Sequence, residues 1–483
     1  MTRSRLKLAV FSASTRPGHE YAHRSWAFGR RRPYPALLPM FGLLLALSGC
    51  ALSREPAPPH GDTDTATVLG IPNARFWADG ETTPFIREIQ LSAKREAAAF
   101  PPGPGGERAP VSFLSLSGGG ENGAFGAGLL VGWTASGRRP EFRLVTGVST
   151  GSLIAPFAFL GPSYDNQLRM VFTNISKQNV LESNDLLPAV LFGEALADSS
   201  PLYRLIARFA NAEMLQAIAR EYEKGRLLFI GTTNLDAQRP VIWNIGAIAA
   251  SGKPGALDLF RRILLASSAI PGAFPPVMIN VDVSGRHYQE MHVDGGAVAQ
   301  AFLYPVRFQL KREAEAVGIK RQRTVYVIRN GRLDADWAST DRHLLSITGR
   351  AIATMIHYSG VNDVLRIYAT ARRDGLRFRL AYIGVDAPDE PHPQFDTAYM
   401  RSLFDYAYQK AAHGYPWRTA PPGLEEHANG KRAAPSVSDA TSRPSSPETR
   451  SGYEGAGARS PRPNLQLGLP TAMPASEFAL EAK

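Results

Sequence analysis

The sequence contains very little cysteine: Cys50 is the only one among 483 residues. A single thiol excludes an intramolecular disulfide and any metal site built from several cysteines, so packing has to hold the fold together. Charged residues are also few, at 20%, whereas 44% of the residues are hydrophobic. This composition excludes a mostly disordered chain and predicts a globular protein with one large core or two smaller ones.

A basic stripe interleaved with aromatic residues is missing from the body of the chain. The formal charge is +11, but residues 1–32 carry eight Lys or Arg against one acidic residue. The remainder carries only +4, which is small for its size. We therefore expect no nucleic-acid partner. No cluster of side chains has metal-ligand spacing, so we expect neither a metal nor an organic cofactor.

The first fifty residues have the pattern of a secretory leader. A cluster of arginines, Arg30–Arg32, precedes an apolar run that ends at Cys50 and is too short to span a bilayer comfortably. Leu47-Ser48-Gly49-Cys50 resembles a bacterial lipobox, in which the cysteine receives a diacylglyceryl group and becomes the mature N-terminus. We predict a signal peptide at 1–49 and a membrane anchor on Cys50. The alternative is a stray thiol after an ordinary signal peptide.

Composition divides the rest of the chain. Residues 50–75 hold the lipidated cysteine and a linker rich in proline and polar residues. Residues 76–417 are the predicted folded domain, and 418–483, rich in Pro, Ser and Ala without periodicity, are predicted to be disordered. Because Ala51 and Leu52 lack the aspartate of an inner-membrane retention signal, we expect a bacterial envelope protein on the outer membrane, facing the periplasm.

Short apolar strands alternate with helical segments along the folded domain. This order predicts parallel βαβ units with right-handed crossovers, and so an α/β fold with a mainly parallel central sheet. Strands are expected at 111–116, 142–148, 226–235, 241–245, 287–296, 324–330 and 376–385, and helices at 124–137, 151–161, 201–223, 256–268, 298–317, 342–373 and 396–413. Residues 186–198 are apolar and are either a lid or channel wall, or a core helix.

One pentapeptide has the pattern of a nucleophilic serine. Gly147-Val148-Ser149-Thr150-Gly151 is a G-x-S-x-G sequence between a predicted strand and a predicted helix. On such a turn the serine hydroxyl projects, and glycines two residues away remove side chains that would clash. Taken alone, an ordinary turn at Ser149 explains the pattern equally well.

A second glycine-rich stretch would supply what a nucleophilic serine needs. Acyl transfer develops negative charge on the carbonyl oxygen, and preorganised donors must meet that charge. Gly118, Gly119 and Gly120 lie where a strand meets a helix, so their amide groups can approach a ligand at the positive end of the helix dipole. We favour an oxyanion hole over a phosphate-binding loop, because the Walker lysine is missing.

The serine also needs a base. Asp294 precedes Gly295 and Gly296, and a carboxylate that is partly desolvated in an apolar crevice can take the serine proton directly. His292 would face the same side of a strand as Asp294, so a histidine base stays open. The other histidines considered are His287, His343, His357 and His413.

The order of these motifs resembles the patatin-like phospholipases, a family of lipid acyl hydrolases. G-G-G-x-x-G is followed about thirty residues later by G-x-S-x-G and, far downstream, by D-G-G. Leu264–Val277 strengthens the resemblance, because the family carries a similar A-S-x-A-x-P-x-x-F-P-P stretch before its D-G-G/A. The resemblance covers 111–300. Two positions depart from the family pattern, with Ser117 where an aspartate is common and Asn122 where many members have a basic residue.

The resemblance implies a three-layer α/β/α fold and a Ser–Asp dyad. Ser149 would be the nucleophile, Asp294 the base and Gly118–Gly120 the oxyanion hole. The glycines that would support these motifs are Gly123, Gly147, Gly151, Gly295 and Gly296. The expected activity is hydrolysis of phospholipid or lysophospholipid esters. Two alternatives stay open: an α/β-hydrolase with a histidine-containing triad, and an envelope lipid-binding protein without turnover. The sequence makes no prediction of oligomeric state.

Overall fold

The computed structural model describes residues 54–103, 107–174, 176, 180, 182–183 and 197–424. All of them belong to the first of the two units into which the chain divides, Met1–Glu426. None of the helices in this part of the chain combines the length and the hydropathy that a bilayer-crossing segment needs. The predicted signal peptide, Cys50, most of the candidate lid at 186–198 and residues 425–483 of the predicted tail lie outside the described residues.

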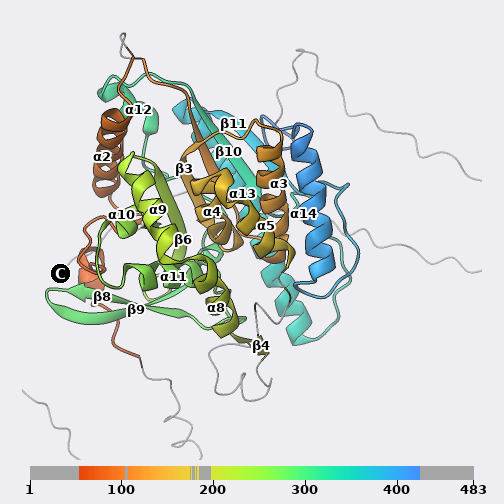
Figure 1. The fold of residues 1–483 in the computed structure, drawn as a ribbon. Helices are drawn as coiled ribbons and strands as arrows, with labels where there is room; N and C mark the ends of the chain where they lie inside the picture. The colour runs from red at the N-terminus through yellow and green to blue at the C-terminus, as the bar shows by residue number, and fades with distance from the viewer. Residues whose placement is uncertain are drawn as a thin grey trace, which may run out of the picture. The chain divides into compact units, whose positions relative to one another are not determined.

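Five parallel strands, in the order β6-β3-β2-β10-β11, form one side of the central sheet up to its edge at β11. Figure 1 labels β6, β3, β10 and β11. Each of the five strands coincides with a strand expected from the sequence. Their bounds are β2 (Val111–Leu116), β3 (Phe142–Val148), β6 (Leu227–Asn234), β10 (Arg323–Arg329) and β11 (Arg377–Tyr382). Parallel strands place their carboxyl ends at one edge of the sheet, and at that edge ligands usually bind in α/β folds.

Four antiparallel strands extend the sheet from β6. One edge of β6 pairs with β7, which pairs with β1, while the end of β6 pairs with β9, which forms a hairpin with β8. Strands β1 and β8 were not expected. The tight turn between β8 and β9, Ser284-Gly285, has φ of 50 and 77° and is a hairpin signal that could have been found. The bounds are β1 (Arg75–Trp77), β7 (Arg239–Asn244), β8 (Val277–Val283) and β9 (Arg286–Asp294).

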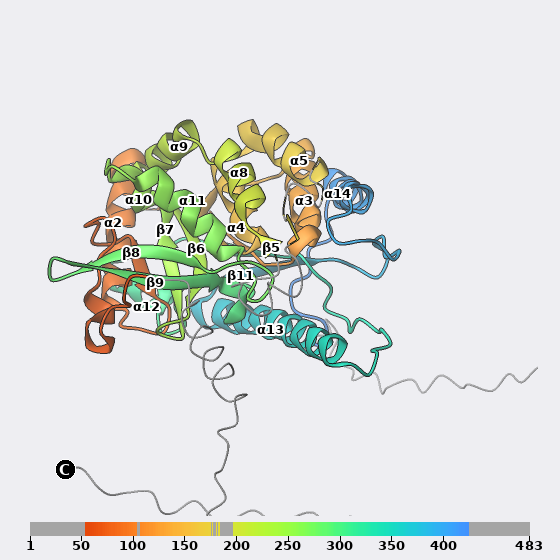
Figure 2. The same cartoon turned by 90° about the horizontal axis from the view of Figure 1, so that it is seen from below.

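Helices cover both faces of the sheet, so the domain has the three-layer α/β/α arrangement. Figure 2 shows α3, α4, α8 and α11 on one face and the long helix α13 on the other. The helices are α2 (Thr83–Ala99), α3 (Gly123–Ala135), α4 (Thr150–Leu160), α5 (Asp165–Thr173), α8 (Ser200–Phe209), α9 (Ala212–Glu223), α10 (Ile245–Ala250), α11 (Ala256–Ser267), α12 (Leu310–Ala316), α13 (Leu344–Asp374) and α14 (Thr397–Ala412). Two short strands, β4 (Glu182–Ser183) and β5 (Ala197–Asp198), pair separately.

Two hydrophobic cores lie on the two faces of the sheet. Successive side chains of a strand point to opposite faces, so Leu114 belongs to one core and Phe113 to the other. The first core lies under the helices around α3, α4 and α11, and the second between the sheet, α2 and α13. Burial on both faces explains why the buried residues are consecutive over 113–116 of β2, 144–148 of β3 and all of β6.

Two expected helices differ from those in the structure. The helix expected at 201–223 is divided into α8 and α9, because the side chain of Asn211 accepts the Met214 amide at 2.9 Å and begins a new helix. The helix expected at 298–317 is helical only over α12. Residues before α12 follow an irregular path instead, and Asp363 of α13 accepts the amides of Gln300 and Ala301 at 2.6 and 3.0 Å.

The folded domain is longer than expected at both ends. Val68 and Ile71, which fall in the predicted linker, are buried in the first core. At the other end, Arg418 pairs with Leu380 of β11 through two backbone hydrogen bonds of 2.8 and 3.0 Å. The boundaries expected at 75 and 417 are therefore too narrow, because short segments without periodicity can still be covered by, or pair with, a distant part of the chain.

Several glycines of α3 are explained by packing. A Cβ on Gly128 would lie 2.1 Å from the carbonyl oxygen of Phe404, and one on Gly132 would lie 2.2 Å from that of Tyr408. Both carbonyls belong to α14, so the two helices approach until their backbones touch. Part of the cost of glycine in α3 is thus offset by close helix packing, whereas a Cβ on Gly123, the first residue of α3, would lie 2.2 Å from Oγ1 of Thr150.

Candidate active site

Ser149 occupies a strained turn between β3 and α4. Its φ of 54° and ψ of −128° lie in a region that residues with a side chain rarely adopt. A Cβ on Gly147 would lie 2.4 Å from the carbonyl oxygen of Gly151, and one on Gly151 would lie 2.4 Å from that of Leu116. Both glycines of the pentapeptide are therefore required by the turn. This geometry is that of a nucleophile elbow.

A buried serine from α11 ties this turn to the neighbouring strand. The hydroxyl of Ser267 accepts the amide of Ser149 at 3.0 Å and donates to the carbonyl of Gly231 at 2.7 Å. Ser267 lies in the stretch 264–277 that carries part of the family resemblance, but its role was not predicted. The unusual backbone of Ser149 is thus held by a hydrogen bond from outside its own turn.

The sheet register brings Asp294 beside Ser149. Strand β3 pairs with β6 up to Val148 and Gly231, where β3 ends. Beyond that point β9 pairs with the edge of β6 that β3 no longer occupies, and Asp294 lies opposite Thr232. The residue after Val148 and the residue opposite Thr232 are therefore neighbours. The structure brings together two side chains that lie 145 positions apart in the sequence.

The carboxyl group of Asp294 is almost completely removed from water. The residue is 4% exposed, and burial raises the pKa of this carboxyl from 3.8 to about 7. Hydrogen bonds from the Ser149 hydroxyl and from the Gly296 amide, the latter at 2.7 Å, favour the charged form and oppose this shift. A base with a pKa near neutrality can accept a proton and return it in the same reaction cycle.

The two glycines after Asp294 allow neighbouring atoms to approach the backbone closely. A Cβ on Gly295 would lie 2.6 Å from the carbonyl oxygen of Gly231, and one on Gly296 would lie 2.4 Å from Nε2 of Gln300. The backbone amide of Gly296 donates a hydrogen bond to the Asp294 carboxylate. The D-G-G sequence therefore lets the backbone fold against β6 and around its own carboxylate.

The glycine loop at 118–120 lies against Ser149. A Cβ on Gly118 would lie 3.1 Å from the Cβ of Ser149. The amide of Gly118, however, already donates to the carbonyl of Gln300 at 2.9 Å. The amides of Gly119 and Gly120 have no acceptor among the described residues. Two of the three expected donors are thus open to a ligand, and the third fixes the loop.

Two residues, the last of β10 and the one after it, form hydrogen bonds that hold the glycine loop in place. Asn330 donates its side-chain amide to the carbonyl of Ser117 at 2.8 Å and accepts the amide of Gly126 at 3.0 Å. A Cβ on Gly119 would lie 1.9 Å from the carbonyl oxygen of Asn330. The buried Arg329 donates to the carbonyl of Gly118 at 3.1 Å. Neither residue was predicted, because nothing in the local sequence links 329–330 to a loop two hundred residues earlier.

The histidine expected as the alternative base is fully engaged elsewhere. His292 is buried, and its Nδ1 lies 3.0 Å from the hydroxyl of Thr232, which accepts the indole N–H of Trp243 at 2.8 Å. The Glu290 carboxylate can only accept, so Nε2–H donates to it at 3.1 Å, and in the neutral ring Nδ1 then accepts from the threonine hydroxyl. Burial lowers the pKa of His292. Both ring nitrogens are engaged, so the imidazole has no free nitrogen to offer Ser149.

The other four histidines have contacts away from the dyad or are exposed. His287 pairs with Asp282 on the β8–β9 hairpin, and the side chain of His413 contacts the last turn of α14. His343 is the exposed residue that precedes α13, and His357 is a half-buried residue in the first half of α13. Within the described residues, no histidine contacts Ser149, and no group of three or more acidic, histidine or cysteine side chains could hold a metal ion.

A cavity of about 340 Å³ lies beside the dyad. Val148, which precedes Ser149, and Gly295, which follows Asp294, both line it. The rest of the wall comes mainly from apolar side chains of β7, the 298–306 segment and α13. Ligand pockets in proteins commonly have volumes of about 300 to 1,000 Å³ and apolar walls. The cavity therefore has the size and the apolar character of a ligand pocket, and it is lined by residues next to Ser149 and Asp294, not by the dyad itself.

Comparison with known proteins gives one family match. Residues 114–306 match the model described as patatin-like phospholipase. Among solved structures, the crystal structure of VipD from Legionella pneumophila is similar at 13% identity, over 65% of this chain and 69% of that chain, with a TM-score of 0.27. No curated protein matches this chain.

Proposed function

We propose that this protein hydrolyses carboxylic ester bonds of lipids with Ser149 as nucleophile and Asp294 as base, and the match of residues 114–306 to the patatin-like phospholipase model supports this proposal. The observation that carries the proposal is the pairing of a strained, projecting serine with a desolvated carboxyl group whose pKa is near 7. Such a carboxylate can deprotonate a hydroxyl without an intervening imidazole.

Acylation would proceed in two steps. Asp294 takes the proton of the Ser149 hydroxyl while Oγ attacks the ester carbon, and the carbonyl oxygen becomes an oxyanion facing the amides of Gly119 and Gly120. When this intermediate collapses, the bond to the alcohol oxygen breaks, and Asp294 returns its proton to the departing alcohol. The products of this half-reaction are an acyl-serine and a free alcohol, which would be a lysolipid when the substrate is a phospholipid.

Deacylation would use the same groups. Asp294 accepts a proton from a water molecule that attacks the acyl-serine, and the Gly119 and Gly120 amides again meet the oxyanion. The proton then passes to Oγ of Ser149 as the ester bond breaks, which releases the fatty acid and restores the dyad. No other proton carrier is needed, because each proton that Asp294 takes in one step is returned in the next.

The cavity beside the dyad supports a lipid substrate. An engineered cavity of about 150 Å³ accommodates the six carbons of benzene, so 340 Å³ would take a chain of about a dozen carbons. We propose that this chamber holds the acyl chain that is transferred to Ser149. The preferred substrates would then be phospholipids or lysophospholipids with an acyl chain of that length or longer.

Exposed apolar side chains support action at a lipid surface. The first half of α13 begins after β10 ends, so it lies at the sheet edge that also carries Ser149. On it Leu344 is 78% and Met355 71% exposed, and the preceding Trp337 is 89% exposed. We propose that this half of α13 contacts the membrane. We also propose lipidation of Cys50 and an envelope location. Incorporation of labelled palmitate by the wild type but not by Cys50→Ala would test the lipidation.

The activity is tested with the full-length protein and mixed phospholipid vesicles, with released fatty acids and lysolipids measured by mass spectrometry. We expect release by the wild type and none above background by Ser149→Ala or Asp294→Asn. Release that persists in Asp294→Asn but not in Ser149→Ala would replace the dyad by a histidine-dependent mechanism. Vesicle binding without release by any form would support a lipid-binding protein instead.

A further inference from the structure

A second cavity, of about 110 Å³, lies at the opposite edge of the sheet from Ser149. It is formed where β2, β3 and β6 begin, and α2 and α12 cover it. Ser149 follows the end of β3, whereas the residue of β3 that lines this cavity, Leu144, is near its beginning. The two sites are therefore separated by the length of the strands, and nothing in the proposed reaction uses this cavity.

The wall of the cavity is mostly apolar. Side chains from α2 and from the beginnings of three strands face it, among them Ile86, Ile89, Val111, Phe113, Leu144 and Leu227. By the same comparison with benzene, the space takes about four or five carbon atoms. An apolar space of this size suits a short alkyl chain, and the partly open side leaves room for a longer chain to continue into solvent.

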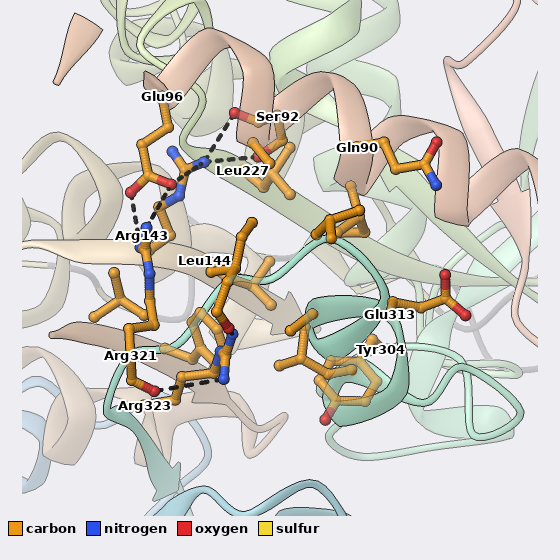
Figure 3. Close-up of a pocket in the computed structure, with 18 of the residues that line it drawn as sticks. Gln90, Ser92, Glu96, Arg143, Leu144, Leu227, Tyr304, Glu313, Arg321 and Arg323 are labelled. Atoms are coloured by element: carbon orange, nitrogen blue, oxygen red, sulfur yellow. Dashed lines mark hydrogen bonds and ion pairs between the residues drawn. The ribbon is translucent and has the colours of Figure 1, made fainter. Parts of the chain in front are cut away.

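Arginines gather at one side of the cavity, where Figure 3 shows them around a single carboxylate. Glu96 forms a bidentate pair with Arg321 at 2.8 and 3.0 Å and also pairs with Arg143 and Arg108, both at 3.3 Å. One negative charge is thus shared by three cations. Burial lowers the pKa of Arg143 to about 10; the charge of Glu96 opposes this shift, and the neighbouring arginines add to it.

Of the three arginines that line the cavity, one has no carboxylate partner within the described part of the chain. Arg323 lines the cavity beside Leu144 and Tyr304 (Figure 3). Its guanidinium donates only to the carbonyls of Arg321 and Ile319, at 3.5 and 3.4 Å, which are long for hydrogen bonds. Burial and the charge of Arg321 lower its pKa. A partly buried guanidinium without a carboxylate is costly, and an anionic ligand would offset that cost.

We propose that this cavity binds a single-chain carboxylate, with the carboxylate on Arg323 and the first carbons of the chain against the apolar wall. The planar guanidinium fork matches a carboxylate in geometry and charge. Glu313 and Gln90 lie on the other side of the cavity (Figure 3), so the positive side alone attracts the head group. The cavity is a binding site for a small fatty acid and is independent of the catalytic dyad.

The test measures binding of hexanoate to the full-length Ser149→Ala protein by isothermal titration calorimetry. We expect hexanoate to bind at least tenfold more tightly than hexanol or hexylammonium, because the head group must be an anion. Affinity should rise about fourfold per methylene from butanoate to hexanoate and then level off as the cavity fills. Equal binding of hexanol, or tighter binding of hexyl phosphate than of hexanoate, would overturn the assignment of a carboxylate.

Two variants locate the site. Arg323→Gln removes the unpaired cation and should weaken hexanoate binding at least tenfold, whereas Lys311→Gln, which removes an exposed charge of α12 outside the cavity, should leave it unchanged. Ala93→Leu fills the cavity and should abolish binding. Arg323 makes no ion pair with any residue that the structure describes, so its variant is expected to fold even if Ala93→Leu does not. Unchanged binding by Arg323→Gln would place hexanoate elsewhere, for example at the dyad, and would overturn the proposal.

Discussion

Replacing Asp294 by asparagine should remove activity and at the same time stabilise the folded protein at neutral and alkaline pH. In the folded state burial raises the pKa of this carboxyl from 3.8 to about 7. Between these two values the folded protein binds a proton that the unfolded chain does not bind, so stability falls as the pH rises. Above pH 7 the folded state carries a buried charge that asparagine lacks.

The size of the effect follows from the shift. About three pKa units at about 1.4 kcal/mol each give a destabilisation of at most about 4 kcal/mol above pH 7, which disappears below the unfolded pKa near 4. Asparagine is nearly isosteric and can still accept the Gly296 amide. The variant should therefore have a higher free energy of unfolding at pH 8 by up to this amount, and the same one as the wild type at pH 4.

Denaturant unfolding of both proteins at pH 4, 6 and 8 measures this difference. Asp341→Asn, at an exposed carboxyl group before α13, is the matched control and should show no pH-dependent gain. The quantity compared is the difference in free energy of unfolding between Asp294→Asn and the wild type at each pH. If this difference is zero at pH 8, or is smaller at pH 8 than at pH 4, the carboxylate is not desolvated. The argument for Asp294 as a base with a pKa near neutrality would then fail.

Three further predictions follow from the site and its surroundings. The kcat/KM of the wild type should fall about tenfold per pH unit below pH 7 as Asp294 is protonated, and a profile flat down to pH 5 would contradict this base. Gly119→Ala would place a Cβ 1.9 Å from Asn330, displace the glycine loop and lower kcat on the order of a hundredfold with little effect on KM. Met355→Asp should weaken vesicle binding and vesicle hydrolysis while hydrolysis of a soluble short-chain ester stays unchanged; a loss in both assays would argue against a membrane contact.

Much of the fold could be predicted because its signals are local. Each parallel strand contains a short, mainly apolar stretch, and in β2, β3 and β6 the buried residues are consecutive because both faces of the sheet are covered. Two features that were not predicted also have local signals in the sequence. They are the division of 201–223 at Asn211 and the hairpin turn at 284–285. The irregular path before α12 had none, since it depends on Asp363, which approaches from α13.

The candidate site divides in the same way. The elbow around Ser149 could be predicted because two glycines and a strand-to-helix turn are encoded within five residues. The engagement of the Gly118 amide by Gln300 could not, and neither could the support of the loop by Asn330. These partners are contributed by separate segments, and only the packing of α13 and β10 beneath the loop brings them together.

The sequence by itself determined which residues have the chemistry: a serine on a glycine turn, a glycine-rich stretch before a helix, and an aspartate before two glycines. Tertiary structure alone decided how they act. Asp294 is adjacent to Ser149 only because β6 continues beyond the end of β3, and β9 pairs with the part of β6 that β3 leaves unpaired. Its proton affinity is raised because that edge is buried, and His292 is unavailable because Thr232 and Glu290 occupy its nitrogens. Burial and register depend on contacts between distant segments, and no local pattern encodes them.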